Sequence, residues 1–198
     1  MFLGGNNLPQ GWHGTDRYVI GELGFGTGLN FLNAWKLFEV TTQPSQSLDF
    51  ISFEKYPLTA AEIAHHLQPY EEVFEGRLQT LLAQYPLLIP GFHRVVLNQR
   101  ITLTLIFDDV NAAIPKLVAP VDAWFLDGFK PSTNPDMWRR ALFDDMARLS
   151  HNGTTLATYT AAGQVRRDLT AAGFALEKVP GYGRKRHMTI GQYSGANS

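Results

Sequence analysis

Short apolar segments alternate with amphipathic segments of helical length along this chain, and no other feature constrains its fold as strongly. Strands that alternate with helices typically form a mostly parallel sheet with helices on both faces. We therefore predict an α/β protein of this kind. The predicted strands are residues 18–22, 48–53, 94–97, 101–107, 123–126, 153–159, 174–179 and 187–193, and the predicted helices are 29–38, 59–66, 71–84, 111–118, 135–150 and 164–172.

The segments between these elements carry turn signals. Residues 85–93 hold two prolines and a glycine and predict a loop, and Asn98-Gln99 predicts the turn of a hairpin between strands 94–97 and 101–107. Pro135 suits the first turn of the helix that follows it, and Gly173 suits the end of helix 164–172.

Composition excludes several classes of protein. The 198 residues are 44% hydrophobic, which suffices for a packed core, and we expect one domain over residues 1–198. No apolar run approaches the roughly 18 residues of a membrane helix, and the start of the chain lacks the pattern of a secretory signal, so a cytoplasmic location is the default. The absence of cysteine excludes disulfides and thiol chemistry. The six histidines have no metal-binding spacing, so we expect no metal.

A glycine-rich turn joins the first predicted strand to the first predicted helix. The run Glu22-Leu23-Gly24-Phe25-Gly26-Thr27-Gly28 places alternating glycines where a backbone can approach a ligand closely. The dinucleotide fingerprint needs a small residue at position 29, where this chain has Leu29, so a nicotinamide-dependent reductase is disfavoured. An acid two residues before such a run resembles the first motif of class I S-adenosylmethionine-dependent methyltransferases. An ordinary glycine-rich turn is the alternative.

Acidic residues follow two further strands. Glu54 ends the strand 48–53, where a carboxylate can accept hydrogen bonds from both hydroxyls of a ribose. Asp108 and Asp109 follow the strand 101–107; in this methyltransferase class an acid at that point contacts the adenine amino group. The alternatives are a solvated acid at the strand end for Glu54 and a helix N-cap for one of the two aspartates.

The loop after strand 123–126 is the most informative segment. It reads Asp127-Gly128-Phe129-Lys130-Pro131-Ser132-Thr133-Asn134-Pro135 and lies at the edge where open α/β sheets bind their ligands. A carboxylate, an aromatic ring and two prolines suit a planar base held against Phe129 while Asp127 bonds an amine. A structural turn with Asn134 as a helix cap is the alternative.

The charge balance leaves only local patches for binding nucleic acid. Seventeen basic and eighteen acidic residues give a net charge of −1, so no global positive field attracts a polyanion. The cluster Arg184-Lys185-Arg186, with Arg166 and Arg167 on the preceding helix, predicts a local phosphate-binding face. A solvated hairpin end is the alternative.

Taken together, these motifs resemble the methyltransferase part of the MnmC family, the bifunctional tRNA 5-methylaminomethyl-2-thiouridine biosynthesis proteins. The resemblance runs nearly end to end and is carried by the blocks Phe2-Leu3-Gly4-Gly5-Asn6, Gly24-Phe25-Gly26-Thr27-Gly28-Leu29-Asn30-Phe31, Phe53-Glu54-Lys55-Tyr56-Pro57-Leu58, Val121-Asp122-Ala123-Trp124-Phe125-Leu126-Asp127-Gly128-Phe129, Asn134-Pro135-Asp136-Met137-Trp138 and Gly181-Tyr182-Gly183-Arg184-Lys185-Arg186.

The resemblance implies a class I fold with an antiparallel last strand and methylation of the aminomethyl nitrogen of the tRNA wobble uridine from S-adenosylmethionine. It makes Asp127 catalytic. Substrate contacts are expected at Phe129, Pro131, Asn134, Arg184, Lys185 and Arg186, and cofactor contacts at Glu22, Gly24, Gly26, Thr27, Gly28, Asn30, Glu54, Lys55 and Asp109.

Two departures from the family qualify these expectations. Members usually carry a further stretch before Phe2, so we expect a domain shortened at its N-terminus. The flavin-dependent part is absent, so we expect no flavin in this chain and an oxidoreductase partner for the preceding step. A small-amine methyltransferase, an aminopropyltransferase-like enzyme and a silent module that binds S-adenosylmethionine or tRNA remain alternatives.

Overall fold

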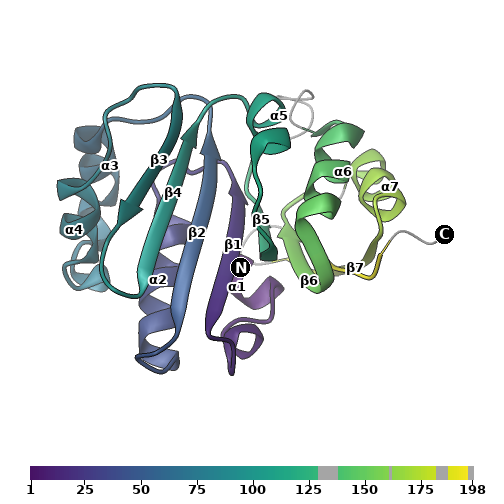
Figure 1. Ribbon diagram of the computed structural model, residues 1–198, viewed down its shortest axis with the longest axis horizontal. Coiled ribbons are helices and arrows are strands. Elements are labelled where there is room, and N and C mark those ends of the chain that lie inside the picture. Colours follow the sequence, from purple (N-terminus) through teal and green to yellow (C-terminus); the bar gives the residue numbers. More distant parts are fainter. Residues whose placement is uncertain (129–137, 161, 182–186, 196–198) are drawn as a thin grey trace.

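A mixed sheet of eight strands forms the centre of the molecule, with helices packed on both faces (Figure 1). The computed structural model describes residues 1–128, 138–160, 162–181 and 187–195. The strand order is β3-β4-β2-β1-β5-β6-β8-β7. The strands are β1 (Arg17–Leu23), β2 (Ser47–Glu54), β3 (Gly91–Val96), β4 (Ile101–Phe107), β5 (Val121–Leu126), β6 (Ser150–Thr158), β7 (Phe174–Pro180) and β8 (His187–Tyr193).

Five neighbouring strands run parallel, namely β4, β2, β1, β5 and β6. At one end of the sheet β8 runs antiparallel to both β6 and β7, which confirms the predicted antiparallel last strand. At the other end β3 adds an antiparallel edge to β4. Because the five central strands point the same way, their carboxyl ends meet along one edge of the sheet.

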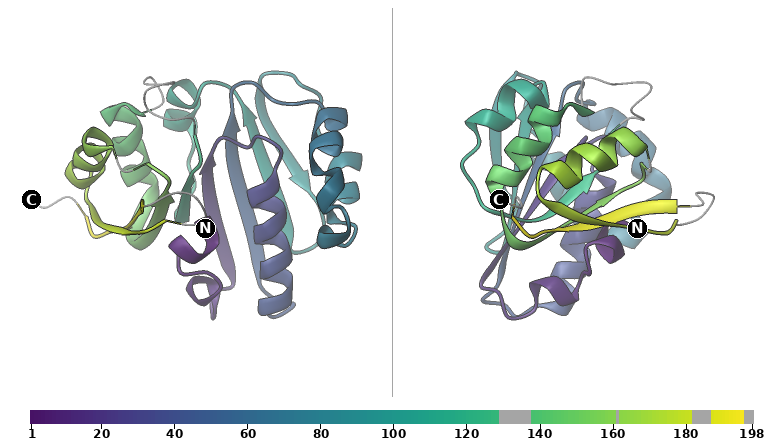
Figure 2. Two further views of the ribbon diagram at one scale, coloured as in Figure 1. Left: turned by 180° about the vertical axis from the view of Figure 1, so that it is seen from behind. Right: turned by 90° about the vertical axis from the view of Figure 1, so that its right-hand side faces the viewer.

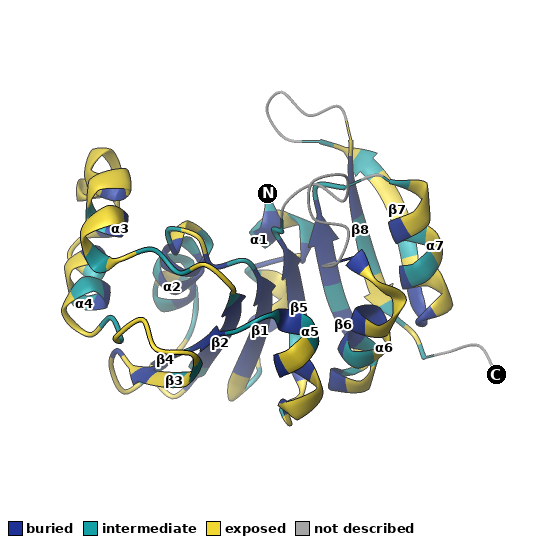
Figure 3. Cartoon of the chain, turned by 90° about the horizontal axis from the view of Figure 1, so that it is seen from above, coloured by how far each residue is buried: buried dark blue, intermediate teal, exposed yellow. Residues whose placement is uncertain are grey.

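Two apolar cores hold the helices against the sheet. One core contains Phe31 and Phe38 of α2 and faces α1 to α4; the other contains Phe143 of α6 and faces α5 to α7. Figure 2 shows these helix groups on opposite sides, and Figure 3 shows buried central strands between helices with exposed outer faces. The helices are α1 (Phe2–Gly5), α2 (Leu29–Thr41), α3 (Ala60–Leu67), α4 (Arg77–Ala83), α5 (Val110–Ala113), α6 (Arg140–Leu149) and α7 (Gly163–Ala171), and the 3₁₀ turns are η1 (Gln10–Trp12), η2 (Gln68–Tyr70), η3 (Glu72–Phe74) and η4 (Ile114–Lys116).

The predicted helix 71–84 is wrong in its first half. Glu75 and Gly76 have φ angles of 51° and 84°, in the left-handed region that ends a helix. The 3₁₀ turn η3 therefore ends before these residues, and α4 begins at Arg77. Gly76 indicated a helix boundary at this point, but the prediction followed the apolar spacing, which continues through it.

Other boundaries also differ from the predictions. The predicted loop 85–93 ends early because β3 begins at Gly91 and pairs along its full length with β4. The predicted helix 111–118 is the single turn α5 followed by the 3₁₀ turn η4, since Pro115 has no N–H to continue an α-helix. Of the predicted helix 135–150, positions 135–137 lie outside the described residues, and α6 runs from Arg140 to Leu149, with Ser150 as the first residue of β6. Every helix in the described part of the chain is too short or too polar to span a bilayer.

Asp122 and His151 form an ion pair at the edge of the sheet opposite the strand carboxyl ends, and it leads to the first prediction. Asp122 of β5 lies 2.7 Å from the Nε2 atom of His151, and its other oxygen accepts the backbone N–H of Val19 at 2.6 Å. The hydrogen bond to Asp122 raises the pKa of His151. A histidine whose pKa is raised by folding stabilises the fold below its unfolded pKa, and this contribution disappears as the pH rises through the folded pKa.

We therefore expect the melting temperature of the parent to fall more between pH 6 and pH 8 than that of His151→Gln. Because His151 is half exposed, the difference should be small, roughly 1–3 °C. His13→Gln, at an exposed loop position, is the matched control and should behave as the parent. Equal pH dependence in His151→Gln and the parent would contradict the assignment.

Candidate active site

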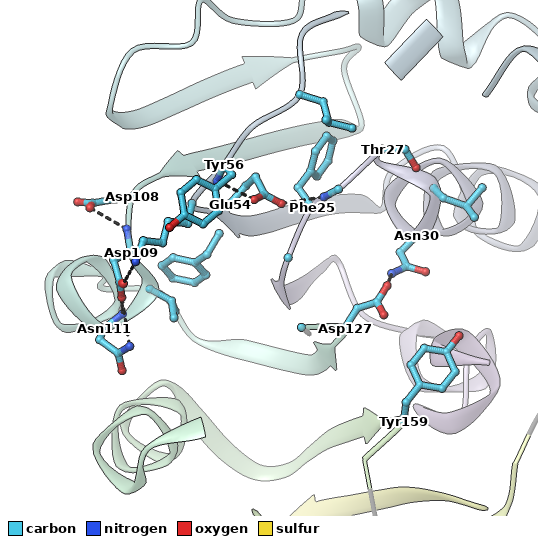
Figure 4. A pocket seen from close by; sticks show the side chains of 18 residues that line it. Phe25, Thr27, Asn30, Glu54, Tyr56, Asp108, Asp109, Asn111, Asp127 and Tyr159 are labelled. Carbon is cyan, nitrogen blue, oxygen red and sulfur yellow. Dashed lines mark hydrogen bonds and ion pairs between the residues drawn. The ribbon is translucent and has the colours of Figure 1, made fainter. Parts of the chain in front are cut away.

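A cavity of about 620 Å³ opens at the carboxyl ends of the central strands (Figure 4). Its walls come from the segments that follow β1, β2, β4, β5 and β6, so five parallel strands contribute to one site. The residues that line it are Gly24, Phe25, Gly26, Thr27, Leu29, Asn30, Phe53, Glu54, Lys55, Tyr56, Leu58, Asp108, Asp109, Val110, Asn111, Asp127, Gly128 and Tyr159.

The glycine-rich turn forms the floor of this cavity. Gly24, Gly26 and Gly28 have φ angles of 93°, 54° and 77°, which residues other than glycine rarely adopt. Gly28 is the N-cap of α2, so the turn leads directly into that helix. A Cβ atom at Gly26 would meet no heavy atom within 4 Å. The backbone at Gly26 therefore borders open space that a ligand can fill.

Glu54 connects the glycine-rich turn to the end of β2. One carboxylate oxygen accepts the N–H of Gly26 and the other accepts the N–H of Tyr56, both at 2.9 Å. Each oxygen retains capacity for a further hydrogen bond. The predicted ribose acceptor thus lines the cavity and also holds its floor.

Glu22 lies beneath the cavity and does not line it. Its side chain is fully buried and accepts hydrogen bonds from Ser52 Oγ at 2.7 Å and from Asn30 Nδ2 at 2.9 Å. Burial raises the pKa of this carboxyl well above its usual range. The same amide nitrogen of Asn30 donates to Asp127 Oδ2 at 2.7 Å. Glu22 is therefore connected to the cavity through Asn30.

An ion pair joins the ends of β2 and β4 at the cavity wall. Lys55 Nζ lies 2.9 Å from Asp109 Oδ2, and the other oxygen of Asp109 caps α5 by accepting the N–H of Asn111. The hydrogen bond from Lys55 lowers the pKa of Asp109, and the same bond raises the pKa of Lys55. Asp108 also lines the cavity, and it accepts the backbone N–H of Asp109. The anticipated cap is thus Asp109.

Tyr159 also lines the cavity, although the sequence predicted it only as the last residue of the strand 153–159. It follows β6 and lies edge-on against Phe2 of α1, with ring centroids 5.0 Å apart. Burial, and then the charge of Asp127, raises the pKa of the Tyr159 phenol. Its position directly after a parallel strand could have predicted a place in the cavity.

Phe129, Pro131, Asn134, Arg184, Lys185 and Arg186 lie outside the described residues. Within the described ranges, no group of three or more histidine, aspartate or glutamate side chains is arranged to hold a metal ion.

The charges of the cavity favour a cationic ligand over a phosphate. Glu54, Asp108, Asp109 and Asp127 line it, whereas Lys55 is the one lysine or arginine among the lining residues that the structure describes and is already paired with Asp109. A pyrophosphate would meet like charges there, while a sulfonium or ammonium group would be attracted. Together with the open glycine floor and the Glu54 carboxylate, this set of groups fits S-adenosylmethionine.

Comparisons with known proteins agree with this chemistry. Residues 72–194 match the sequence model of a family described as S-adenosyl-L-methionine-dependent methyltransferase. The chain is 54% identical over 195 residues to the tRNA 5-methylaminomethyl-2-thiouridine biosynthesis bifunctional protein MnmC of Chromobacterium violaceum, covering 96% of this chain and 29% of that protein. The protein of the same name from Methylobacillus flagellatus is 49% identical, covering 98% of this chain and 30% of that protein. The chain therefore spans less than a third of the length of these curated relatives.

Solved structures support the fold. MnmC2 from Aquifex aeolicus superimposes with a TM-score of 0.76 at 24% identity, covering 98% of this chain and 59% of that one. The antibiotic-resistance methyltransferase Kmr gives a TM-score of 0.51 at 13% identity, covering 97% and 93%. The family match spans more than half of the chain. The chain belongs to the S-adenosyl-L-methionine-dependent methyltransferases.

Proposed function

We propose that this chain methylates the aminomethyl nitrogen of 5-aminomethyl-2-thiouridine at the wobble position of tRNA. The observation that carries the proposal is the Asp127 carboxylate on the wall of the cavity, held by Asn30, in a chain about half identical to proteins named for 5-methylaminomethyl-2-thiouridine biosynthesis. A fixed carboxylate beside a methyl-donor site suits an amine acceptor.

The glycine-rich turn and the acids of the cavity would hold the cofactor. We assign the ribose hydroxyls to Glu54, the adenine side to Asp109 with Lys55, and the close backbone approach to Gly24 and Gly26, with Thr27 beside them. Gly28, also predicted as a cofactor contact, is not among the lining residues and is the N-cap of α2. When bound, S-adenosylmethionine supplies an electrophilic methyl group on a sulfonium. The amide nitrogen of Asn30, by contrast, donates to two carboxylates of the protein itself.

Asp127 acts on the acceptor. An alkylamine is mostly protonated at neutral pH, as lysine is, so the reacting form is the neutral amine that has released its proton to water. The Asp127 carboxylate would accept a hydrogen bond from the amine, orient its lone pair, and stabilise positive charge as it grows on nitrogen. Holding both reactants in one cavity supplies much of the remaining acceleration. The wobble base must be presented unstacked, which is the role we assign to Phe129 with Pro131 and Asn134.

The assignment of Glu54 predicts a loss of cofactor affinity. Glu54→Ala removes a charged acceptor from the ribose and also releases the N–H of Gly26, so we expect S-adenosylmethionine to bind roughly tenfold more weakly or worse. Glu54→Gln keeps one acceptor and should lose less. Isothermal titration calorimetry measures both constants, and thermal melting checks the fold. Unchanged binding in Glu54→Ala would show that Glu54 does not contact the ribose. Glu22 is too deeply buried to take over this contact.

Transfer of radiolabelled methyl groups to competing acceptors tests the acceptor class. With tRNA that carries the aminomethyl group and polyamines present together, we expect label in the tRNA. Label in polyamines would indicate a small-amine methyltransferase or an aminopropyltransferase-like enzyme. Cofactor binding without any transfer would indicate a silent binding module.

The basic cluster Arg184-Lys185-Arg186 is our proposed phosphate contact for tRNA. Replacing all three with alanine should reduce the slope of log K against log salt, by about 0.7–0.9 for each phosphate that is no longer neutralised. Lys116→Ala, at the exposed end of η4, is the control and should keep the parent slope. An unchanged slope in the triple variant would make the cluster a solvated hairpin end.

The substrate amine must come from another reaction. We propose that an oxidoreductase partner supplies it, and that both steps take place in the cytoplasm, where tRNA is modified. Addition of such an enzyme to tRNA that lacks the free amine should make methyl transfer by this chain possible.

A further inference from the structure

The side-chain amide of Asn30 lies between two carboxylates from distant parts of the chain. Asn30 is in the first turn of α2, Glu22 is in β1, and Asp127 follows β5. Its Nδ2 atom donates to Glu22 at 2.9 Å and to Asp127 at 2.7 Å. Figure 4 shows the amide directed toward the Asp127 carboxylate inside the cavity. One amide group thus connects the buried acid to the acid at the surface of the site.

The surroundings determine which way this amide faces. The Asp127 carboxylate only accepts hydrogen bonds, so the amide must present its nitrogen to it. The same nitrogen donates to Glu22, which accepts in its ionised form or through the carbonyl oxygen of its neutral form. The remaining oxygen of Glu22 accepts the hydroxyl of fully buried Ser52 at 2.7 Å. Glu22 is therefore fixed from behind and holds the amide of Asn30 in turn.

Burial raises the pKa of Glu22, which favours its neutral form. The amide of Asn30, anchored on Glu22, directs a donor at Asp127 and adds no charge of its own beside the reacting amine. An aspartate in place of Asn30 would have no N–H to donate to either acid.

We propose that Asn30 is a positioning residue, whose amide, anchored on Glu22, holds the Asp127 carboxylate toward the position of the reacting amine. The role rests on the proposed function, because it is the amine acceptor that Asp127 must face. A fixed Asp127 carboxylate stabilises the reacting amine better than a mobile one, because neighbouring hydrogen bonds restrict it to the productive rotamer.

Ligand selectivity in the absence of tRNA tests this role. Sinefungin carries a charged amine in place of the sulfur-bound methyl group, whereas S-adenosylhomocysteine carries no group there. We expect the parent to prefer sinefungin, and Asn30→Ala and Asp127→Ala each to reduce that preference by roughly fivefold or more. Asn33→Ala is the matched control, because Asn33 is on the same helix and its amide donates to the Leu29 carbonyl of that helix. Calorimetry gives the constants, and melting curves check that each variant folds.

A second readout uses the protein without ligand. The ¹⁵N-resolved side-chain amide signal of Asn30, assigned by its disappearance in Asn30→Ala, should shift in Asp127→Ala and in Glu22→Gln and stay in place in Asn33→Ala. Glu22→Gln retains an acceptor for Asn30, so it should lose less of the sinefungin preference than Glu22→Leu.

Two outcomes would overturn the proposal. One is an Asn30 amide signal that does not respond to Asp127→Ala. The other is a sinefungin preference that Asn30→Ala leaves at the parent value, or that the parent lacks altogether. Failure of the proposed function is a separate result, since it is a lack of methyl transfer to tRNA in a parent that passes both binding tests.

Discussion

Asp127→Asn should lower the single-turnover rate of methyl transfer to aminomethyl-containing tRNA by roughly 10²–10³ at saturating S-adenosylmethionine. The substitution keeps the shape of the side chain and one acceptor oxygen, but it removes the negative charge that stabilises positive charge on the attacking nitrogen. Cofactor affinity should stay within a few-fold of the parent value, because Glu54 and the glycine-rich turn supply the contacts that we assign to the cofactor.

Rapid-quench measurements and calorimetry together separate these two effects. Asp168→Asn, on α7 and bonded to Gln164 of the same helix, is the control for the loss of an aspartate charge and should transfer methyl groups at the parent rate. A higher pH should recover part of the Asp127→Asn rate if Asp127 also selects the neutral amine. Equal rates in Asp127→Asn and an active parent would leave Asp127 as a residue of the strand-end turn only.

Gly26→Val should reduce cofactor binding by at least about a hundredfold, which corresponds to roughly 2.7 kcal/mol. The side chain would extend into open space at the floor of the cavity, since a Cβ atom there meets no heavy atom within 4 Å. The φ angle of 54° adds backbone strain of about 1–2 kcal/mol for a residue with a Cβ atom. Calorimetry would measure the affinity and thermal melting the stability.

Gly76→Val separates strain from obstruction. Gly76 also has a left-handed φ angle, 84°, and a Cβ atom added there would also meet no heavy atom within 4 Å, but this glycine is the N-cap of α4 and does not line the cavity. Both variants should lose stability, and only Gly26→Val should lose cofactor affinity. Parallel losses of affinity in the two variants would mean that the effect of Gly26→Val is global.

Sequence patterns predicted the part of the site that local chemistry determines. Alternating glycines need a turn, and the apolar strand before them needs a buried position in the sheet, so the floor of the cavity follows from residues 18–28. Glu54 and Asp127 could be placed because Glu54 ends one buried strand and Asp127 directly follows another, and parallel strands bring such residues to one edge.

The features that no sequence pattern predicted are tertiary in origin. Glu22 was predicted to contact the cofactor, but the pairing of β1 with β2 and β5 places it under the turn, beside Ser52. The bond between Asn30 and Asp127 joins residues 97 positions apart, which no local pattern encodes. Tyr159 packs in the cavity wall against Phe2, a residue 157 positions earlier in the chain.

Identification of the methylated atom would show whether this chain methylates the aminomethyl nitrogen of the wobble uridine. The tRNA would be incubated with the parent and ¹³C-methyl S-adenosylmethionine and digested to nucleosides, and the labelled nucleoside identified by mass spectrometry and NMR. We predict a single labelled product, 5-methylaminomethyl-2-thiouridine, with the new carbon on the aminomethyl nitrogen. Label on a ring atom, on a ribose or on another nucleoside, or no label from a protein that binds the cofactor, would contradict the account.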